Sequence, residues 1–359
     1  MKIAQIVSYQ ESVPPNSKNG LEFVVSWITE ELLKRGHEVT LFAPGDSKTK
    51  ASLKSIYPTN LSNAKKVLWY HNDYNNQNLS YAFSMADKFD IIHTHTNPNL
   101  FVGFTKKPVV HTLHSPYRDG FRKMYLTNKK ISGYIKPIID NYEKINYVTI
   151  SKLQQKNYRK CEKYYFKNYT NIYNGIPVEK FKFNDKPEDY LFFMGYISED
   201  KGAHIAVKVA KKTKQKLILA GQYSERHPEY FNKYIKPYLN ENIQYVGPVN
   251  FKQKIKLLKN AKAVINPITW DEPFGLVPVE AQACGTPVLT FKKGAMPEIV
   301  KNNKTGYVVE TEKELMESIK KIDKIDRYEC RKWVEENFSV EKMVDEYEKL
   351  YKKLINKKK

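Results

Sequence analysis

Cysteine is scarce in this chain of 359 residues. Only three are present, Cys161, Cys284 and Cys330, and they lie far apart in the sequence. Three scattered cysteines exclude a disulfide framework and a cysteine-based metal site, and they are typical of a protein in a reducing compartment. We therefore expect a cytoplasmic protein.

Long hydrophobic runs are also missing. No stretch approaches the roughly 20 apolar residues of a membrane-spanning helix. The opening segment, residues 1–8, resembles a strand and is too short for a signal peptide. Asn19 and Gly20 precede the first helical pattern, but the glycine spacing of a dinucleotide fingerprint is missing there. A nicotinamide-dependent enzyme is therefore not expected.

Acidic residues are outnumbered. The chain has 39 Asp and Glu against 60 Lys and Arg, a formal net charge of +21. Such a balance suits nucleic acid, an anionic membrane surface or an acidic substrate, although abundant lysine can also be a solvated surface without a ligand. The excess is concentrated in residues 121–170, and lysines also end the chain at 357–359. We expect no nucleic-acid partner, and peripheral membrane contact stays open.

Strand and helix patterns alternate along the chain. Ile3–Ser8 is a buried strand pattern, a helix follows with Val24, Val25 and Ile28 on one face, and Glu38–Ala43 is the next strand. Strand, helix and strand in this order predict a parallel sheet. Further strands are expected at 91–93, 109–112, 147–150, 190–194, 216–220, 243–247, 263–267 and 287–291, and further helices at 121–145, 202–213, 251–260 and 340–354.

The length suits two domains. Residues 178–190 are polar and contain Pro187, which makes them the best linker candidate. We predict an α/β chain with one Rossmann-like, doubly wound domain over residues 1–177 and a second over 178–339. Such domains would face each other across a cleft at the carboxyl ends of their strands, where these sheets bind ligands.

Two glutamates eight positions apart form the most informative motif. Glu272 follows a strand pattern, Pro-Phe-Gly-Leu comes next, and Glu280 lies within the helix that starts there. The motif therefore places two hydrogen-bond acceptors beside a helix N-terminus, whose free N–H groups favour anions. A nucleotide sugar has the hydroxyls and phosphates that such a site would bind. A glycosidase acid–base pair fits less well, because both carboxylates belong to one loop and the helix that follows it. Glu280 alone could be an ordinary helix-surface glutamate.

A lysine motif precedes the glutamates. Residues 190–202 combine a strand, the turn at Gly195 and then Lys201 at the start of a helix. A lysine in this position can neutralise a phosphate together with the helix amides. In isolation, an exposed lysine in a lysine-rich chain explains the pattern better. Combined with the two-glutamate motif, it favours phosphate binding.

Four histidines follow two neighbouring strand patterns: His93 and His95 end one strand, and His111 and His114 end the other. Imidazoles from adjacent strand ends can hold a metal. Because no Asp, Glu or Cys lies nearby at ligand spacing, we expect no metal. At least one histidine should contact a ligand, and the others should be structural.

The motifs resemble glycosyltransferase family 4, whose members are retaining enzymes with the GT-B fold. The resemblance is carried by Trp270–Val288 and extends over nearly the whole chain. Residues 14–47 resemble the avilamycin-type subgroup. Further similar segments are 90–93, 112–114, 174–175 and 297–300.

The resemblance implies a catalytic set of His114, Lys201 and Glu272. His114 would lie beside the sugar and the departing phosphate, Lys201 would pair with the diphosphate, and Glu272 would hold donor-sugar hydroxyls. No protein nucleophile, cofactor or metal is implied. The acceptor hydroxyl would attack on the face that the phosphate leaves, and the phosphate would take its proton.

The resemblance also implies a donor-binding set and the domain roles. Glu280 would bind the ribose diol, and residues 274–276 would offer backbone N–H groups. The first domain would bind the acceptor, the second the nucleotide sugar, and residues 340–359 would form a helix that crosses back to the first domain. The implied donor-binding residues are Gly20, Tyr196, Lys201, Glu272, Phe274, Gly275, Leu276 and Glu280.

The chain departs from the family pattern at three positions. Tyr196 replaces a common arginine that helps to hold the diphosphate, Asn19 replaces a glycine, and Phe23 replaces another arginine. Tyrosine supplies one hydroxyl and no charge. Lys292 or Lys293 could substitute for the missing charge. The change also leaves open a phosphorylase of similar fold that uses inorganic phosphate.

Together these observations predict a retaining, metal-independent glycosyltransferase. It would move a hexose from a nucleotide sugar, with a UDP-sugar favoured and GDP-mannose next, to a hydroxyl of a saccharide or lipid-linked acceptor. The phosphorylase is the alternative, and a non-catalytic protein that binds polyanions or membranes comes last because it leaves the two-glutamate motif unexplained.

Overall fold

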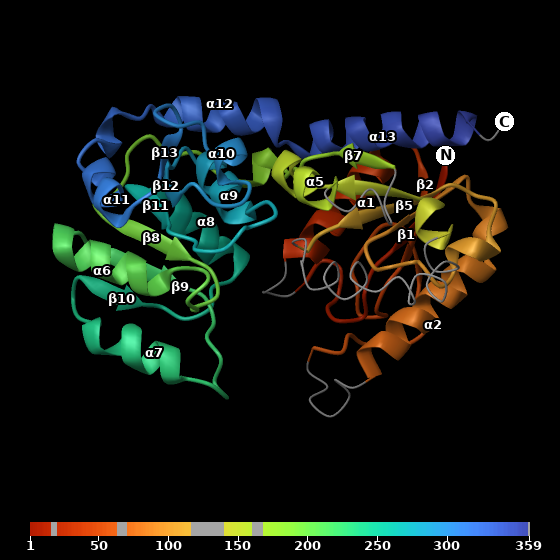
Figure 1. Cartoon of the computed structure of the whole chain (residues 1–359), viewed down its shortest axis with the longest axis horizontal. Helices are drawn as coiled ribbons and strands as arrows, with labels where there is room; N and C mark the ends of the chain where they lie inside the picture. The colour runs from red at the N-terminus through yellow and green to blue at the C-terminus, as the bar shows by residue number, and fades with distance from the viewer. Residues whose placement is uncertain (16–19, 63–69, 116–139, 160–167, 358–359) are drawn as a thin grey trace, which may run out of the picture. The chain divides into compact units, whose positions relative to one another are not determined.

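The computed structural model describes residues 1–15, 20–62, 70–115, 140–159 and 168–357. The greater part of the helix expected at 121–145, much of the basic segment 121–170 and Asn19 lie outside this part of the chain. The chain divides into two compact units, which Figure 1 shows. Unit 1 comprises Met1–Gly175 together with Val340–Lys359, and unit 2 comprises Ile176–Ser339.

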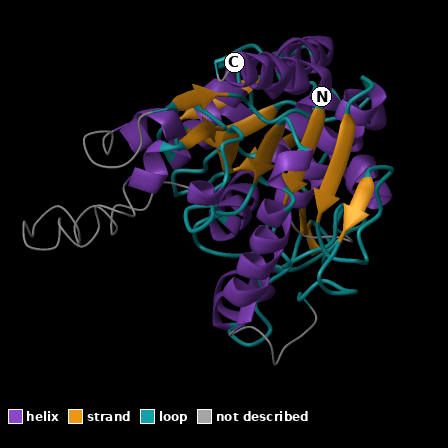
Figure 2. Cartoon of the chain, turned by 90° about the vertical axis from the view of Figure 1, so that its right-hand side faces the viewer, coloured by secondary structure: helices purple, strands orange, loops and turns teal. Residues whose placement is uncertain are grey.

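Unit 1 is built on a parallel sheet of seven strands in the order β3-β2-β1-β4-β5-β6-β7. Figure 2, which views the chain from the side of this unit, shows helices on both sides of strands. The strands are β1 (Lys2–Ile6), β2 (Glu38–Phe42), β3 (Ser52–Lys54), β4 (Ile91–Thr94), β5 (Val109–Leu113), β6 (Ile145–Thr149) and β7 (Tyr169–Asn171), and the helices are α1 (Gly20–Lys34), α2 (His71–Ser84), α5 (Lys152–Arg159) and α13 (Val340–Asn356).

Unit 2 is built on a parallel sheet of six strands in the order β10-β9-β8-β11-β12-β13. The strands are β8 (Leu191–Met194), β9 (Leu217–Ala220), β10 (Ile243–Tyr245), β11 (Ala263–Asn266), β12 (Val288–Phe291) and β13 (Gly306–Val309). The helices are α6 (Ala203–Thr213), α7 (Glu229–Tyr234), α8 (Phe251–Asn260), α9 (Leu276–Ala283), α10 (Met296–Ile299), α11 (Glu312–Ile319) and α12 (Arg327–Asn337).

Both sheets reverse their strand order once, and these reversals decide where ligands can bind. The reversal lies between β1 and β4 in unit 1 and between β8 and β11 in unit 2. In open parallel sheets, ligands bind outside the carboxyl ends of the strands at such a point. The loop after β8 carries Lys201, the loop after β11 carries Glu272, and β4 leads into His95.

The predicted doubly wound α/β architecture is confirmed, and the strands expected from the sequence appear with ends shifted by at most two residues. Three strands were missed: β3, β7 and β13. All three are short and lie at sheet edges, where the side chains are half exposed. β3 and β7 lack the continuous apolar run that identifies a buried parallel strand, so their sequence pattern is weak. β13 contains Tyr307, Val308 and Val309 and could have been recognised.

The last helix, α13, belongs to unit 1 and packs against α1 (Figure 1). Its buried face includes Met343, Val344 and Tyr347. At the end of α1, Arg35 donates to Asp345 at 2.6 Å and to the Glu341 carbonyl at 2.9 Å. The C-terminus of the chain is therefore part of the same compact unit as its N-terminus.

The first turn of α1 contains a buried carboxylate. Glu22 is 2% exposed, and its Oε2 has no hydrogen-bond partner among the described residues. Burial, with a smaller contribution from Glu11, raises the pKa of Glu22 to about 7. The folded chain therefore holds a proton on Glu22 between pH 4.5 and 7 that the unfolded chain releases, so Glu22 makes folding less favourable as the pH rises through this window.

We expect Glu22→Gln to stabilise unit 1 relative to the wild type, and to do so more at pH 8 than at pH 4.5. Glutamine keeps the shape of the side chain and carries no charge. The pKa shift limits the gain to about 3 kcal/mol. Thermal unfolding of both proteins at the two pH values measures it. Glu38→Gln, at an exposed carboxylate of β2, is the control. An equal difference between Glu22→Gln and the wild type at both pH values would contradict the assignment.

Candidate functional site

The loops after β8 and β11 lie side by side at the reversal point of unit 2. The Thr269 N–H donates to the Asp200 carbonyl at 2.9 Å, and the Thr269 hydroxyl donates to the Glu199 carbonyl at 3.2 Å. Gly202 has a φ of +74°, and a Cβ there would lie 1.9 Å from the Pro267 carbonyl oxygen. Only glycine allows this approach. The lysine loop and the glutamate loop are therefore held together as one structure.

This arrangement brings Lys201 and Glu272 into contact. The Lys201 ammonium forms an ion pair with Glu272 Oε2, and the indole Nε1–H of Trp270 donates to the same oxygen at 3.1 Å. Lys201 Nζ also lies 4.8 Å from the centre of the Trp270 ring. The Lys201 and Glu272 side chains are 27% and 17% exposed, so both remain accessible to a ligand. We call these three residues the Lys201–Trp270–Glu272 cluster.

The turn after β12 supports the backbone of this cluster. The Ala295 N–H donates to the Glu272 carbonyl at 2.9 Å. Gly294 has a φ of +54°, and a Cβ there would lie 2.3 Å from both the nitrogen and the carbonyl oxygen of Glu272. Gly294 and Trp270 were not expected at the site. Trp270 could have been recognised from its place two residues before Glu272, whereas Gly294 follows a different strand and lacks a comparable signal. Lys292, proposed as a substitute cation, pairs instead with Glu310 at 3.1 Å.

Helix α9 begins beside the cluster. Its N-cap, Gly275, has a φ of +97°, and among the described residues no side chain caps this end of the helix. The first turn holds no acidic residue, so its amide N–H groups can favour an anion. The Phe274 side chain is 2% exposed and packs edge-on against Phe338. Phe274 therefore anchors the turn, and its possible ligand contact is through the backbone.

Glu280 lies one turn further along α9 and has a partner that the sequence analysis did not expect. Its Oε1 pairs with Lys254 Nζ of α8 at 2.6 Å, and the two residues are 3% and 7% exposed. Glu280 is therefore not an ordinary surface glutamate. The pair also joins α8 to α9, which a sequence separation of 26 residues does not reveal.

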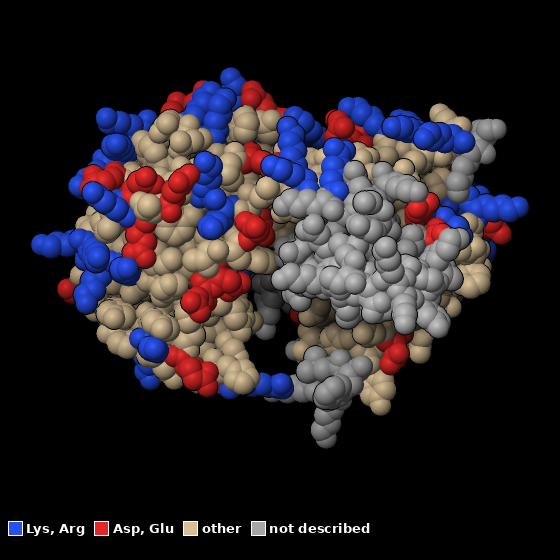
Figure 3. Space-filling model, viewed as in Figure 1, with Lys and Arg blue, Asp and Glu red and all other residues tan. Residues whose placement is uncertain are grey.

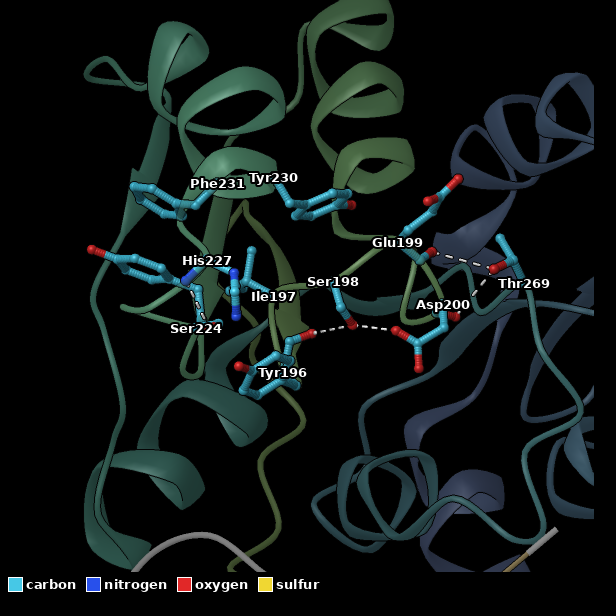
Figure 4. A pocket seen from close by; sticks show the side chains of 11 residues that line it. Tyr196, Ile197, Ser198, Glu199, Asp200, Ser224, His227, Tyr230, Phe231 and Thr269 are labelled. Carbon is cyan, nitrogen blue, oxygen red and sulfur yellow. Dashed lines mark hydrogen bonds between the residues drawn. The ribbon is translucent and has the colours of Figure 1, made fainter. Parts of the chain in front are cut away.

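A pocket of about 610 Å³ lies on unit 2 between the lysine loop and α7 (Figure 4). Tyr196 lines it and is 46% exposed. The opposite wall comes from the loop after β9 and from α7. It was not expected, because the pattern around Gly221 carries no recognised motif. The lining residues are Tyr196, Ile197, Ser198, Glu199, Asp200, Tyr223, Ser224, His227, Tyr230, Phe231 and Thr269.

The structure also brings together the histidines of unit 1 at the ends of β4 and β5. His95 Nδ1 lies 2.9 Å from His114 Nε2, and His111 Nδ1 lies 3.1 Å from the Thr94 carbonyl oxygen, to which it can donate. Burial lowers the pKa of His114 to about 3 and that of His111 to about 4, so both are neutral at pH 7.

Gly20, the other residue of unit 1 that was expected at the site, is exposed at the start of α1.

Three observations concern metals, charge and membranes. Within the described ranges, no group of three or more His, Cys, Asp or Glu side chains has metal-binding geometry. On the visible face of unit 2, Lys and Arg are interspersed with Asp and Glu (Figure 3). No helix of the described part of the chain is both long and apolar enough to cross a bilayer.

Two family models match the chain. The model described as Glycosyltransferase Family 4 matches residues 18–180, and the model described as Glycosyl transferases group 1 matches residues 177–340. A similar curated protein is the uncharacterized glycosyltransferase MJ1607 of Methanocaldococcus jannaschii, which is 26% identical over 86% of this chain and 85% of its own length. The D-inositol 3-phosphate glycosyltransferase of an Arthrobacter species is 28% identical over 39% of this chain and 33% of its own length.

Solved structures share the fold. AviGT4, a glycosyltransferase involved in avilamycin A biosynthesis, has a TM-score of 0.73 and 22% identity and covers 99% of this chain and 98% of its own. HepE of Anabaena, solved with UDP and glucose, has a TM-score of 0.73 and 16% identity and covers 98% of this chain and 100% of its own. The two matched domains together span residues 18–340, each unit is built on a parallel sheet, and solved glycosyltransferases share the fold, so the chain is an enzyme of glycosyltransferase family 4, a glycosyltransferase with the GT-B fold.

Proposed function

We propose that the enzyme is a retaining, metal-independent hexosyltransferase. It would use a UDP-sugar as donor and a hydroxyl of a saccharide or lipid-linked molecule as acceptor. The observation that carries the proposal is the Lys201–Trp270–Glu272 cluster beside the N-terminus of α9. The cluster supplies a cation and a carboxylate, and the N-terminus of α9 supplies amide N–H groups, a combination that suits a sugar diphosphate. HepE, which shares the fold, was solved with UDP and glucose, which favours UDP over GDP.

In this proposal, Lys201 and Glu272 contact different parts of the bound donor. Lys201 and the backbone N–H groups of residues 274–276 stabilise the negative charge that grows on the departing diphosphate. Glu272 accepts hydrogen bonds from the sugar hydroxyls, while Trp270 keeps its carboxylate in place. These interactions strengthen as charge develops, which is how preorganised dipoles and cations lower a barrier.

The proposed retaining step uses the same arrangement. The acceptor hydroxyl attacks the anomeric carbon on the face from which the diphosphate leaves, the glycosidic bond to phosphate breaks, and the phosphate oxygen takes the hydroxyl proton. Glu272 is engaged by Lys201 and Trp270, which suits a hydrogen-bonding role better than that of a nucleophile. Catalysis then depends on position and electrostatics.

The remaining roles belong to the same proposal. Glu280 would bind the ribose diol while Lys254 holds its carboxylate. His114 would hydrogen-bond the transferred sugar, and Gly20 and Tyr196 would contact the donor. Tyr196 lines the pocket beside the lysine loop, which supports a contact with a ligand on unit 2.

Calorimetric titration of the whole chain with UDP and with GDP tests the donor. We expect UDP to bind more tightly, and the product formed from a UDP-sugar to keep the anomeric configuration of the donor, as read by NMR. Binding of neither nucleotide, together with phosphate-dependent cleavage of a disaccharide, would overturn the proposal in favour of a phosphorylase. An inverted product anomer would overturn the retaining step alone.

A further inference from the structure

A chain of buried hydrogen bonds in unit 1 runs to His114 from the interior of the sheet. Gln5 of β1 is fully buried at the reversal point between β1 and β4. Its Oε1 lies 3.0 Å from His95 Nε2, and its Nε2 lies 3.3 Å from His93 Nδ1. His95 Nδ1 in turn lies 2.9 Å from His114 Nε2. One amide group therefore contacts two histidines, and one of them contacts His114.

The chemistry of the amide gives these hydrogen bonds a direction. An amide oxygen only accepts, so the proton of His95 is on Nε2, where it donates to Gln5. Burial lowers the pKa of His95 well below its usual range, so the ring is neutral and its Nδ1 is an acceptor. His114 Nε2 must then donate to His95. Because His114 is also neutral, its Nδ1 carries a lone pair and no proton.

The other half of the network agrees with this direction. The Gln5 amide N–H and the Tyr351 hydroxyl, which lies 2.6 Å away, can both donate to His93 Nδ1. The proton of His93 is then on Nε2, which donates to the Thr112 hydroxyl at 2.8 Å. The Thr112 hydroxyl lies 2.8 Å from the hydroxyl of Tyr347. Two tyrosines of α13 therefore close the network on the side away from His114.

We propose that Gln5 and His95 are positioning residues that hold His114 as the Nε2–H tautomer, with Nδ1 as a hydrogen-bond acceptor. His114 then suits a ligand hydroxyl, which donates, and not a phosphate oxygen, which accepts. This choice of ligand group rests on the function proposed above. The tautomer itself does not, because it follows from contacts within unit 1. His114 would therefore act as a neutral acceptor and not as a charged histidine, because burial keeps its ring neutral.

The tautomer can be measured directly by ¹⁵N NMR of the whole chain with labelled histidine at pH 7. The two ring nitrogens of a neutral imidazole have distinct shifts, and the loss of a signal in His114→Gln assigns the residue. We expect a protonated Nε2 and an unprotonated Nδ1 at His114. A proton on Nδ1, or a charged ring, would overturn the proposal whether or not the enzyme binds UDP.

Variants test the route from Gln5 to His114. Gln5→Met keeps the length of the side chain and removes both hydrogen bonds, so the Nε2–H tautomer of His114 should give way to a mixture. An unchanged tautomer would show that Gln5 does not set it. If Gln5→Met does not fold, the tautomer is read in Gln5→Glu, which keeps an acceptor toward His95. There it should persist, and its loss would count against the proposal.

His95 offers a matched pair. Asparagine places its amide near the position of Nδ1, so His95→Asn keeps an acceptor for His114. Glutamine places its amide near the position of Nε2, so His95→Gln keeps the contact with Gln5 and loses that with His114. We expect kcat/KM to fall about 10- to 100-fold in His95→Gln, as for the loss of one buried hydrogen bond, and much less in His95→Asn. Equal losses in the two variants, with the His114 tautomer unchanged in both, would assign His95 a structural role only.

Discussion

Glu272→Ala should lower kcat by about 10²- to 10⁴-fold while the chain stays folded. The carboxylate is the shared acceptor of Lys201 and of the Trp270 indole, and in the proposed mechanism it also accepts from the donor sugar. Its removal leaves the sugar without that acceptor and Lys201 without its ion-pair partner. Because Lys201 and Glu272 are partly exposed, the effect on stability should be about 1 kcal/mol or less.

A second variant tests whether the negative charge of Glu272 is needed or only its hydrogen-bond acceptor. Glu272→Gln keeps an acceptor for Trp270 and loses the negative charge, so its turnover should lie between that of the wild type and that of Glu272→Ala. Lys201→Ala should also lose turnover and should in addition weaken UDP binding, because Lys201 is assigned to the diphosphate. Lys212→Ala, at an exposed lysine of α6, the helix that follows Lys201, is the control. Full activity in both Glu272→Ala and Lys201→Ala would contradict the assigned roles.

Lys254→Met should destabilise unit 2 by about 3–5 kcal/mol, because it leaves the carboxylate of Glu280 buried without its cation. The ion pair is largely buried, at 9% and 4% side-chain exposure, so water replaces the lost partner poorly. Differential scanning calorimetry measures the loss, and hydrogen exchange of α8 and α9 locates it. The variant should also bind UDP more weakly, since Glu280 is the proposed ligand of the ribose.

The double variant Lys254→Met/Glu280→Gln distinguishes an unpaired charge from a packing defect. Replacing both partners of a buried pair removes the uncompensated charge, so most of the lost stability should return while UDP binding stays weak. Lys256→Met, at an exposed lysine of α8, is the control for the substitution itself. If the double variant is as unstable as Lys254→Met, the lost stability comes from packing and not from an unpaired charge. If it binds UDP as the wild type does, Glu280 is not the ribose ligand.

The core of the fold could be predicted from local patterns. Buried parallel strands carry continuous apolar runs, as in β1, where Ile3, Ala4 and Ile6 are fully buried. The edge strands β3 and β7 were missed because they lack that run. The loops that hold Lys201 and Glu272 were also found, because the carboxyl end of each strand is marked by glycine or proline and by polar residues that follow an apolar run.

The partners of the site residues could not be predicted. Lys254 reaches Glu280 and Gly294 reaches Glu272 from other elements of unit 2, and Gln5 reaches His95 from a strand 90 positions away in sequence. Periodicity describes which face a residue occupies, but it does not describe which residue of another element lies opposite.

The sequence by itself determined the class of fold and the types of chemical group at the site, because burial periodicity and the ends of strands are local properties of the chain. Only the tertiary structure decided how those groups are engaged. The ion pair of Lys201 with Glu272, the buried pair of Lys254 with Glu280 and the hydrogen bonds from Gln5 to His114 all join elements distant in sequence. Sheet topology brings such elements together, and the direction and strength of a hydrogen bond or ion pair exist only once both partners are in place.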